Sequence, residues 1–151
     1  MKNFQSVEEI LDFAVKEEEA SASFYRSLAT KMDRPWMKRV FEDFAAEEEG
    51  HKRKLLKFSA GELSLPPREK VLDLKIGEYL VDAELNADMD YQQALMVAMK
   101  KEKAAFRLYS DLASVADDAA ARELLLALAQ EEARHKLRFE VEYDDVILAE
   151  N

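Results

Sequence analysis

The sequence predicts an all-α protein, an antiparallel four-helix bundle with a long crossover between its second and third helices. The composition is the first reason: 48% of the residues are hydrophobic, 36% are charged, and only three Gly and three Pro interrupt them. The second reason is an internal repeat of two amphipathic segments that carry apolar residues at helical spacing. Because a chain of 151 residues suits one domain with one core, we assign residues 1–151 to a single domain.

The repeat relates two pairs of segments that align without a gap. Residues 14–29 (AVKEEEASASFYRSLA) resemble residues 98–113 (AMKKEKAAFRLYSDLA). Residues 41–55 (FEDFAAEEEGHKRKL) resemble residues 125–139 (LLALAQEEARHKLRF). In both pairs residue n corresponds to residue n + 84, so the two halves of the chain are expected to fold alike.

The repeat divides the chain into two helical hairpins, at residues 6–58 and 90–142, joined by a crossover at residues 59–89. Within the crossover, the Pro-Pro pair at 66–67 rules out a continuous helix, although residues 74–82 are expected to form a short one. A connection of this length can cross the full length of a bundle.

Capping residues set the expected ends of the long helices. Ser6 with Glu9, and Asp90 with Gln93, are spaced as capping boxes, and Gly61 is a stop signal. The expected helices cover residues 7–31, 35–60, 91–115 and 118 to the late 140s.

Several classes of function are excluded by composition. The absence of cysteine excludes disulfides, thiolate zinc sites and iron–sulfur clusters. A net charge of -10 argues against nucleic-acid binding. The sequence shows neither an apolar run of membrane-spanning length nor a signal peptide, so we expect a cytoplasmic protein that does not bind membranes.

The apolar stripe of each helix carries one glutamate, and two stripes also carry a histidine one turn later. These six residues are Glu18, Glu48, His51, Glu102, Glu132 and His135. Glutamate is rarely buried unless it is paired or binds metal. An E-x-x-H pair on a charged helix is often a surface ion pair, but its repetition on an apolar stripe favours metal binding, because both side chains point the same way.

The glutamates of each hairpin also lie at one height. Each is fifteen residues from the turn, which is marked by Asp33 in the first hairpin and Asp117 in the second. At about 1.5 Å per residue, all four lie roughly 22 Å from their turns, so they are expected to meet inside the bundle. One Glu from each of two helices and Glu-x-x-His from the other two is a di-metal carboxylate arrangement, in which two divalent cations would neutralise about four carboxylates.

Two tyrosines lie on the same faces, seven residues after a candidate ligand. Tyr25 and Tyr109 are either core aromatics with satisfied hydroxyls or donors to ligating carboxylates that assist catalysis. The flanking carboxylates are expected to be solvated. They are Glu17, Glu19, Glu47, Glu49 and Glu131.

At these residues the chain resembles the rubrerythrin-like branch of the ferritin-like superfamily, over nearly its whole length. The resemblance implies a ferritin-like bundle with two iron ions bound by the six residues, and a homodimer with or without exchange of helices. Three features depart from related families: the missing cysteines of a rubredoxin module, Ala105 where rubrerythrins carry an extra glutamate, and Glu49 where bacterioferritins carry a haem-ligating Met. Carboxylate and imidazole also suit manganese and zinc, so the metal stays open.

The resemblance implies an oxidoreductase that reduces hydrogen peroxide or dioxygen. The missing rubredoxin module implies that electrons come from a separate donor protein. A ferroxidase or iron-handling protein is the first alternative, and a non-catalytic bundle with structural metal is the second.

Overall fold

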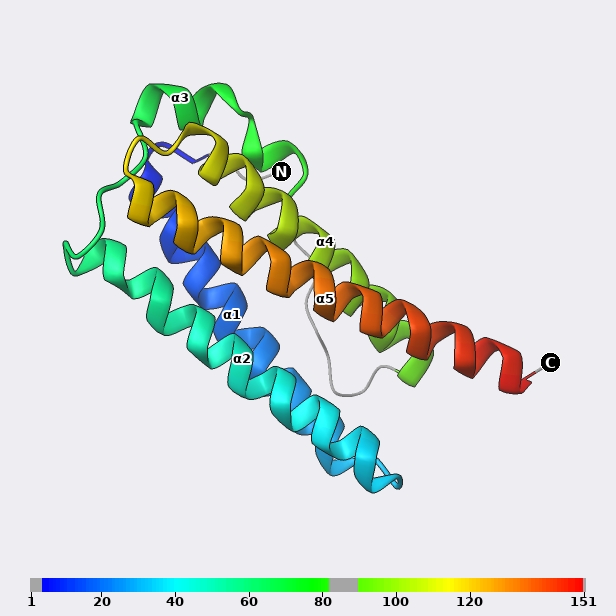
Figure 1. The fold of residues 1–151 in the computed structure, drawn as a ribbon. Helices are drawn as coiled ribbons and strands as arrows, with labels where there is room; N and C mark the ends of the chain where they lie inside the picture. Colours follow the sequence, from blue (N-terminus) through cyan, green and yellow to red (C-terminus); the bar gives the residue numbers. More distant parts are fainter. Residues whose placement is uncertain (1–3, 82–89, 151) are drawn as a thin grey trace.

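The computed structural model of the protein describes residues 4–81 and 90–150. All regular structure in these two ranges is helical (Figure 1). The helices are α1 (Val7–Thr30), α2 (Pro35–Ser59), α3 (Arg68–Asp73), the short 3-10 helix η1 (Ile76–Glu78), α4 (Tyr91–Val115) and α5 (Ala119–Glu150). The four expected helices are therefore present, with bounds that agree to within about a residue, the usual uncertainty of a helix end.

The four long helices form two antiparallel hairpins. Helix α1 packs on α2, and α4 packs on α5. Helix α2 ends at the end of the bundle opposite to the one where α4 begins (Figure 1). The connection between the hairpins therefore crosses the length of the bundle, as the sequence predicts.

The helix ends follow the expected capping chemistry with one difference. Asp90 and Gln93 form a complete capping box. Ser6 accepts the backbone N–H of Glu9 at 3.1 Å, but the Glu9 carboxylate accepts from the N–H of Gln5 instead of Ser6. Helix α1 therefore begins with half of the expected capping box. The Glu9 carboxylate bonds the backbone of the residue before the N-cap instead of the N-cap itself.

The crossover differs from the prediction of one short helix at residues 74–82. Helix α3 begins directly after Pro67, whose fixed φ suits a helix start, and only Ile76–Glu78 form a further 3-10 turn. Lys75 separates the two with a left-handed φ of 52°. Residues 82–89 of the crossover, including the end of the predicted helix, lie outside the described residues.

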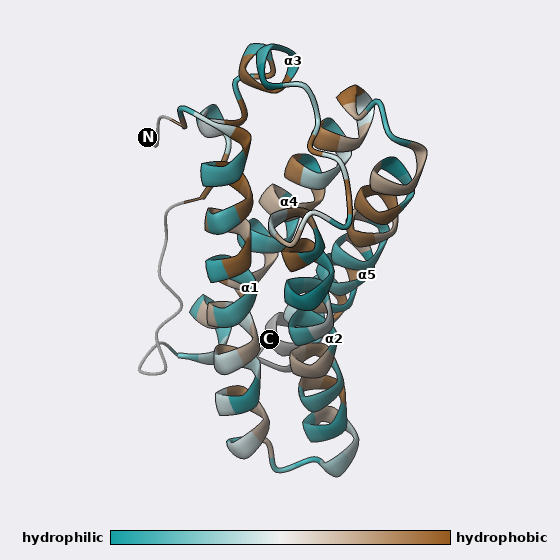
Figure 2. Ribbon diagram, turned by 90° about the vertical axis from the view of Figure 1, so that its left-hand side faces the viewer, coloured by the Kyte–Doolittle hydropathy of each residue, from teal (hydrophilic) through white to brown (hydrophobic). Residues whose placement is uncertain are grey.

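The buried core consists of two hydrophobic clusters at different levels of the bundle. One is largely aromatic and contains Phe24, Phe41, Phe44 and Phe139, whereas the other is largely aliphatic. In Figure 2, hydrophobic and hydrophilic residues alternate along each long helix, as expected for amphipathic helices. In the described part of the chain, no helix is long and apolar enough to cross a membrane.

Candidate metal centre

A layer of buried charged residues separates the two hydrophobic clusters. Each of the four long helices contributes one glutamate to it, and α2 and α5 each add a histidine. The side chains of this layer are 3% exposed or less: Glu18, Glu48, His51, Glu102, Glu132 and His135. The structure thus brings together all six residues that the sequence nominated.

The six residues form two overlapping groups of potential ligands. Glu18, Glu48, His51 and Glu132 can each offer one atom, and these four atoms lie within 4.8 Å of one another. Glu48, Glu102, Glu132 and His135 form a second group by the same measure. Glu48 and Glu132 belong to both groups, whereas Glu18 and Glu102 each belong to one, so two cations held here would share Glu48 and Glu132.

Both imidazole rings turn Nδ1 toward the carboxylates. His51 Nδ1 lies 2.6 Å from Glu132 Oε1, and His135 Nδ1 lies 2.8 Å from Glu48 Oε1. The two rings are nearly parallel, with centroids 6.0 Å apart. Each E-x-x-H histidine therefore contacts the glutamate of the other hairpin's motif, which places one imidazole at each end of the four-carboxylate cluster.

Four buried side-chain atoms of these six residues have no hydrogen-bond partner among the described residues. They are Glu18 Oε2, His51 Nδ1, Glu102 Oε2 and Glu132 Oε1. Although His51 Nδ1 and Glu132 Oε1 are close, their directions do not make a hydrogen bond. A buried polar atom without a partner costs about 1–3 kcal/mol. Two divalent cations would satisfy these lone pairs, so this donor set suits a di-metal centre.

Burial shifts the pKa values of the cluster in the direction expected for crowded carboxylates. Burial, followed by the charges of neighbouring glutamates, raises the pKa of Glu48, Glu102 and Glu132 well above the ordinary value. Burial also acts to raise the pKa of Glu18, but the neighbouring Glu48 and His51 and the hydrogen bond from Tyr109 outweigh it and lower that pKa. Without cations, some of these carboxyls therefore hold protons, and bound metal would replace them.

Tyr25 and Tyr109 join the two hairpins at this layer. Tyr25 on α1 donates to Glu102 on α4 at 2.6 Å, and Tyr109 on α4 donates to Glu18 on α1 at the same distance. Burial and then the adjacent carboxylate raise the pKa of each phenol well above its ordinary value, so both hydroxyls stay protonated donors. Each ring is buried in the core and each hydroxyl bonds a candidate ligand, whereas a part for the two tyrosines in catalysis stays a prediction.

Glu47 and Glu131 correct the expectation that the flanking carboxylates are all solvated. Glu131 Oε2 lies 2.5 Å from His51 Nε2, and Glu47 Oε2 lies 2.6 Å from His135 Nε2. Only about a third of each side chain is exposed, at 34% and 32%. When Nε2 donates to a carboxylate, a neutral imidazole keeps its lone pair on Nδ1, which faces the cluster.

The sequence did not predict that Glu47 and Glu131 contact the imidazoles, because each of these carboxylates contacts the histidine of the other hairpin. Glu47 and its own motif's His51 are four residues apart, which suggests no more than a pair on one helix. Glu17 is also less exposed than expected and pairs with Lys101 at 2.6 Å. Glu19 and Glu49 do pair at the surface, with Lys52 and Arg26.

Comparisons with known proteins bear on the family and the fold of the chain. The sequence pattern of the Rubrerythrin family matches residues 9–143. No curated protein matches the chain. A hypothetical protein from Pyrococcus furiosus has a similar structure, with a TM-score of 0.71 and 26% identity over 92% of this chain and 89% of its own.

A second solved structure supports the fold. It is from Thermotoga maritima, is classed as a ferritin-like diiron-carboxylate protein, and gives a TM-score of 0.72. It is 19% identical, over 97% of this chain and 99% of its own. With the family match covering most of the sequence and every long helix, the chain belongs to the rubrerythrin family and folds as a ferritin-like four-helix bundle.

Proposed function

We propose that this protein is a di-iron oxidoreductase that reduces hydrogen peroxide, or dioxygen, with electrons from a separate donor protein. The observation that carries the proposal is the pair of four-atom ligand groups that share Glu48 and Glu132. Two bound iron ions, cycling between the ferrous and ferric states, would supply the two electrons that, with two protons, convert one hydrogen peroxide into two waters. Because the chain has no cysteine for a thiolate-bound redox centre, the donor is assigned to another protein.

The residues of the chain hold the centre in a fixed geometry. The hydroxyls of Tyr25 and Tyr109 fix the two carboxylates that serve one cation each. Glu47 and Glu131 fix the orientation of the imidazoles. This outer layer of hydrogen bonds orients ligands before metal arrives, which strengthens binding.

A ferroxidase or iron-handling protein is the second candidate, and Ala105 is the observation that favours it. Ala105 lines the cavity beside the four glutamates, at a place where a further carboxylate would make the ligand set asymmetric. With alanine there, the two metal positions have equivalent donors, as the repeat requires. A non-catalytic bundle, or one that holds manganese or zinc, has the same donor chemistry.

One experiment separates these functions. Protein loaded anaerobically with ferrous iron is mixed with hydrogen peroxide or dioxygen at equal concentration in a stopped-flow instrument, and ferric absorbance is followed. We expect faster oxidation by peroxide, with two irons per chain and no large assembly in size-exclusion chromatography. Faster oxidation by dioxygen in an assembly holding many irons per chain would favour the ferroxidase, and no reaction with either oxidant would favour structural metal.

A further inference from the structure

An ion pair joins α1 and α4 beside the metal centre. Lys101 Nζ lies 2.6 Å from Glu17 Oε2, and only 11% of the lysine side chain is exposed. Glu17 and Lys101 occupy equivalent positions of the repeat, so the folding of the two hairpins brings them face to face. Identical residues here would repel one another, whereas the opposite charges of this chain attract.

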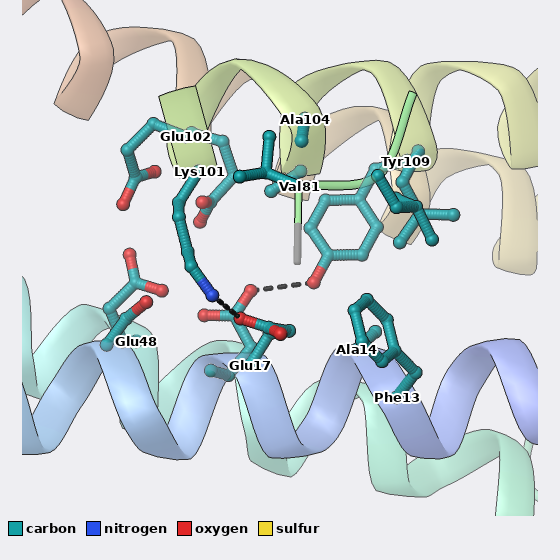
Figure 3. Close-up of a pocket in the computed structure, with 15 residues that line it drawn as sticks. Phe13, Ala14, Glu17, Glu48, Val81, Lys101, Glu102, Ala104 and Tyr109 are labelled. Atoms are coloured by element: carbon teal, nitrogen blue, oxygen red, sulfur yellow. Dashed lines mark hydrogen bonds and ion pairs between the residues drawn. The ribbon is translucent and has the colours of Figure 1, made fainter. Parts of the chain in front are cut away.

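A small cavity lies behind this ion pair. Its lining includes all four glutamates of the centre, and Glu17 and Lys101 are part of its wall. Figure 3 shows Lys101 reaching from α4 to Glu17 on α1, and Glu48 and Glu102 line the same cavity. Because 11% of the Lys101 side chain and 29% of the Glu17 side chain are exposed, whereas the four glutamates are at most 3% exposed, the ion pair lies between those glutamates and solvent.

The cavity is small, and helices and part of the crossover form its walls. It has about 40 Å³ of space for water-sized molecules. Helices α1 and α4 form two sides, and Leu80 and Val81 of the crossover form another. The neighbouring Tyr79 holds this part of the crossover against α4, because its hydroxyl donates to Asp111 and the Arg107 guanidinium lies 5.7 Å from its ring.

Among the described residues of the wall, the lysine has the side chain that can move most easily. Its ammonium is held by one carboxylate, and its flexible four-carbon stem has several rotamers. A molecule of two heavy atoms needs a small rotation of this stem to pass. A molecule with a branched alkyl group needs the ion pair to break and the stem to leave, because the interior otherwise has no spare volume.

We propose that the Glu17–Lys101 ion pair is a size-selective entrance to the metal centre, which admits hydrogen peroxide or dioxygen and excludes organic hydroperoxides. The identity of the oxidant rests on the proposed function above. The position of the entrance rests only on the ion pair and the cavity behind it.

The first test compares oxidants of different size. Ferrous protein is mixed with hydrogen peroxide or with tert-butyl hydroperoxide, both neutral at pH 7, and the rate of ferric formation is measured. For Lys101→Ala we expect about a tenfold faster reaction with tert-butyl hydroperoxide, equivalent to about 1.4 kcal/mol of barrier, and a much smaller change with hydrogen peroxide. Glu17→Gln, which keeps the side-chain size but removes the charge, is expected to shift the ratio of the two rates in the same direction.

Lys52→Ala is the matched control. It removes a lysine–glutamate pair of similar chemistry, with Glu19 at 2.9 Å, that joins α1 to α2 and does not line the cavity. Its two rates should equal those of the unmodified protein. An unchanged ratio of rates in both Lys101→Ala and Glu17→Gln, or an equal change in the control, would overturn the proposed entrance.

A second test needs no turnover, so it separates this proposal from the proposed function. The protein is loaded with Co²⁺, and the association rate of azide is followed by the visible absorption of the cobalt. Loss of a positive charge alone would slow an anion. A faster association in Lys101→Ala therefore indicates that the entrance has opened, with a smaller change than for tert-butyl hydroperoxide because azide is unbranched.

The outcomes remain distinct if either idea fails. If ferrous protein reacts with neither peroxide, peroxide reduction fails as its function and the azide rates alone decide the entrance. If Lys101→Ala does not fold, as judged by far-UV circular dichroism, Lys101→Met keeps the apolar stem and removes the charge. Azide association as slow in a folded Lys101 variant as in the unmodified protein would reject the entrance.

Discussion

Tyr25 on α1 donates a 2.6 Å hydrogen bond to Glu102 on α4, so a core aromatic of one hairpin orients a candidate ligand of the other. The ring itself lies in the aromatic cluster, with its centroid 5.3 Å from that of Phe139. Tyr109 repeats the same contact toward Glu18. The packing of the core and the geometry of the centre are therefore coupled through two hydroxyl groups.

Replacement of Tyr25 by Phe should keep the packing but leave Glu102 Oε1 without its buried donor. We expect a loss of about 1–3 kcal/mol in the free energy of unfolding of the metal-free protein, measured by urea titration. Tyr143→Phe is the control, because the Tyr143 hydroxyl accepts a longer 3.3 Å bond from Gln92 in a less buried place. Equal effects of the two substitutions would mean that the Tyr25 hydroxyl has no special role at the centre.

Replacement of His135 by Ala should reduce the metal content from two ions per chain toward one. The imidazole supplies the only nitrogen of the second ligand group. We expect the helical circular-dichroism spectrum to stay largely intact, since the surrounding helices remain packed. Metal analysis after dialysis gives the stoichiometry, and an unchanged value would remove His135 from the ligand set.

Replacement of Glu47 by Gln should weaken metal binding without removing a ligand. The Glu47 carboxylate lies 2.6 Å from His135 Nε2, and hydrogen-bonded partners of this kind contribute roughly 10–100-fold to metal affinity. Competition with a chelator of known affinity measures the change. Glu19→Gln, at an exposed position on α1, should leave the affinity unchanged, and a similar loss there would indicate a general charge effect.

The metal-free protein should lose stability as the pH rises from acidic to neutral values. The pKa values of Glu48, Glu102 and Glu132 lie above the ordinary value of 4.5 in the folded state. A raised pKa means that the folded state holds protons that the unfolded state releases, so this contribution is complete below about pH 4.5 and declines above it. The lowered pKa of Glu18 acts in the opposite direction but only below about pH 4.5. Above that pH the lowered pKa of His135 opposes the decline, whereas the raised pKa of His51 adds to it.

Bound metal should reverse this dependence. Because cations displace the protons of these carboxyls, metal affinity increases with pH and the added stability increases with it. Thermal unfolding between pH 5 and 8, with chelator and with excess metal, provides the comparison. A melting temperature of the metal-free protein that rises steadily through this range would contradict the assignment of raised pKa values.

Glu142 should be important for stability although it belongs to neither ligand group. Its side chain is 1% exposed, and one oxygen accepts hydrogen bonds from Arg34 at 3.1 Å and from Tyr91 at 3.0 Å. Replacement by Ala should cost about 2 kcal/mol in the free energy of unfolding, a value kept low because Arg34 is half exposed. Chemical denaturation measures this loss, and Glu140→Ala at a more exposed place on α5 is the control.

The long helices and the six buried candidate ligands could be predicted from the sequence because both depend on local periodicity. Helical spacing places Glu48 and His51 on one face of α2 whatever the rest of the chain does. The repeat then places Glu102 and Glu132 at the height of Glu18 and Glu48, since both hairpins have arms of the same length. These features need no knowledge of how the hairpins pack.

Only the tertiary structure decided which residues of one hairpin contact the other. The pairing of Glu47 with His135, of Tyr25 with Glu102 and of Lys101 with Glu17 joins residues that are far apart in the chain. Sequence spacing carries no information about such distances, because they depend on how the two hairpins are turned against each other. The short helix α3 and the left-handed Lys75 were likewise set by the path of the crossover over the bundle, which overrides weak local preferences in a segment this short.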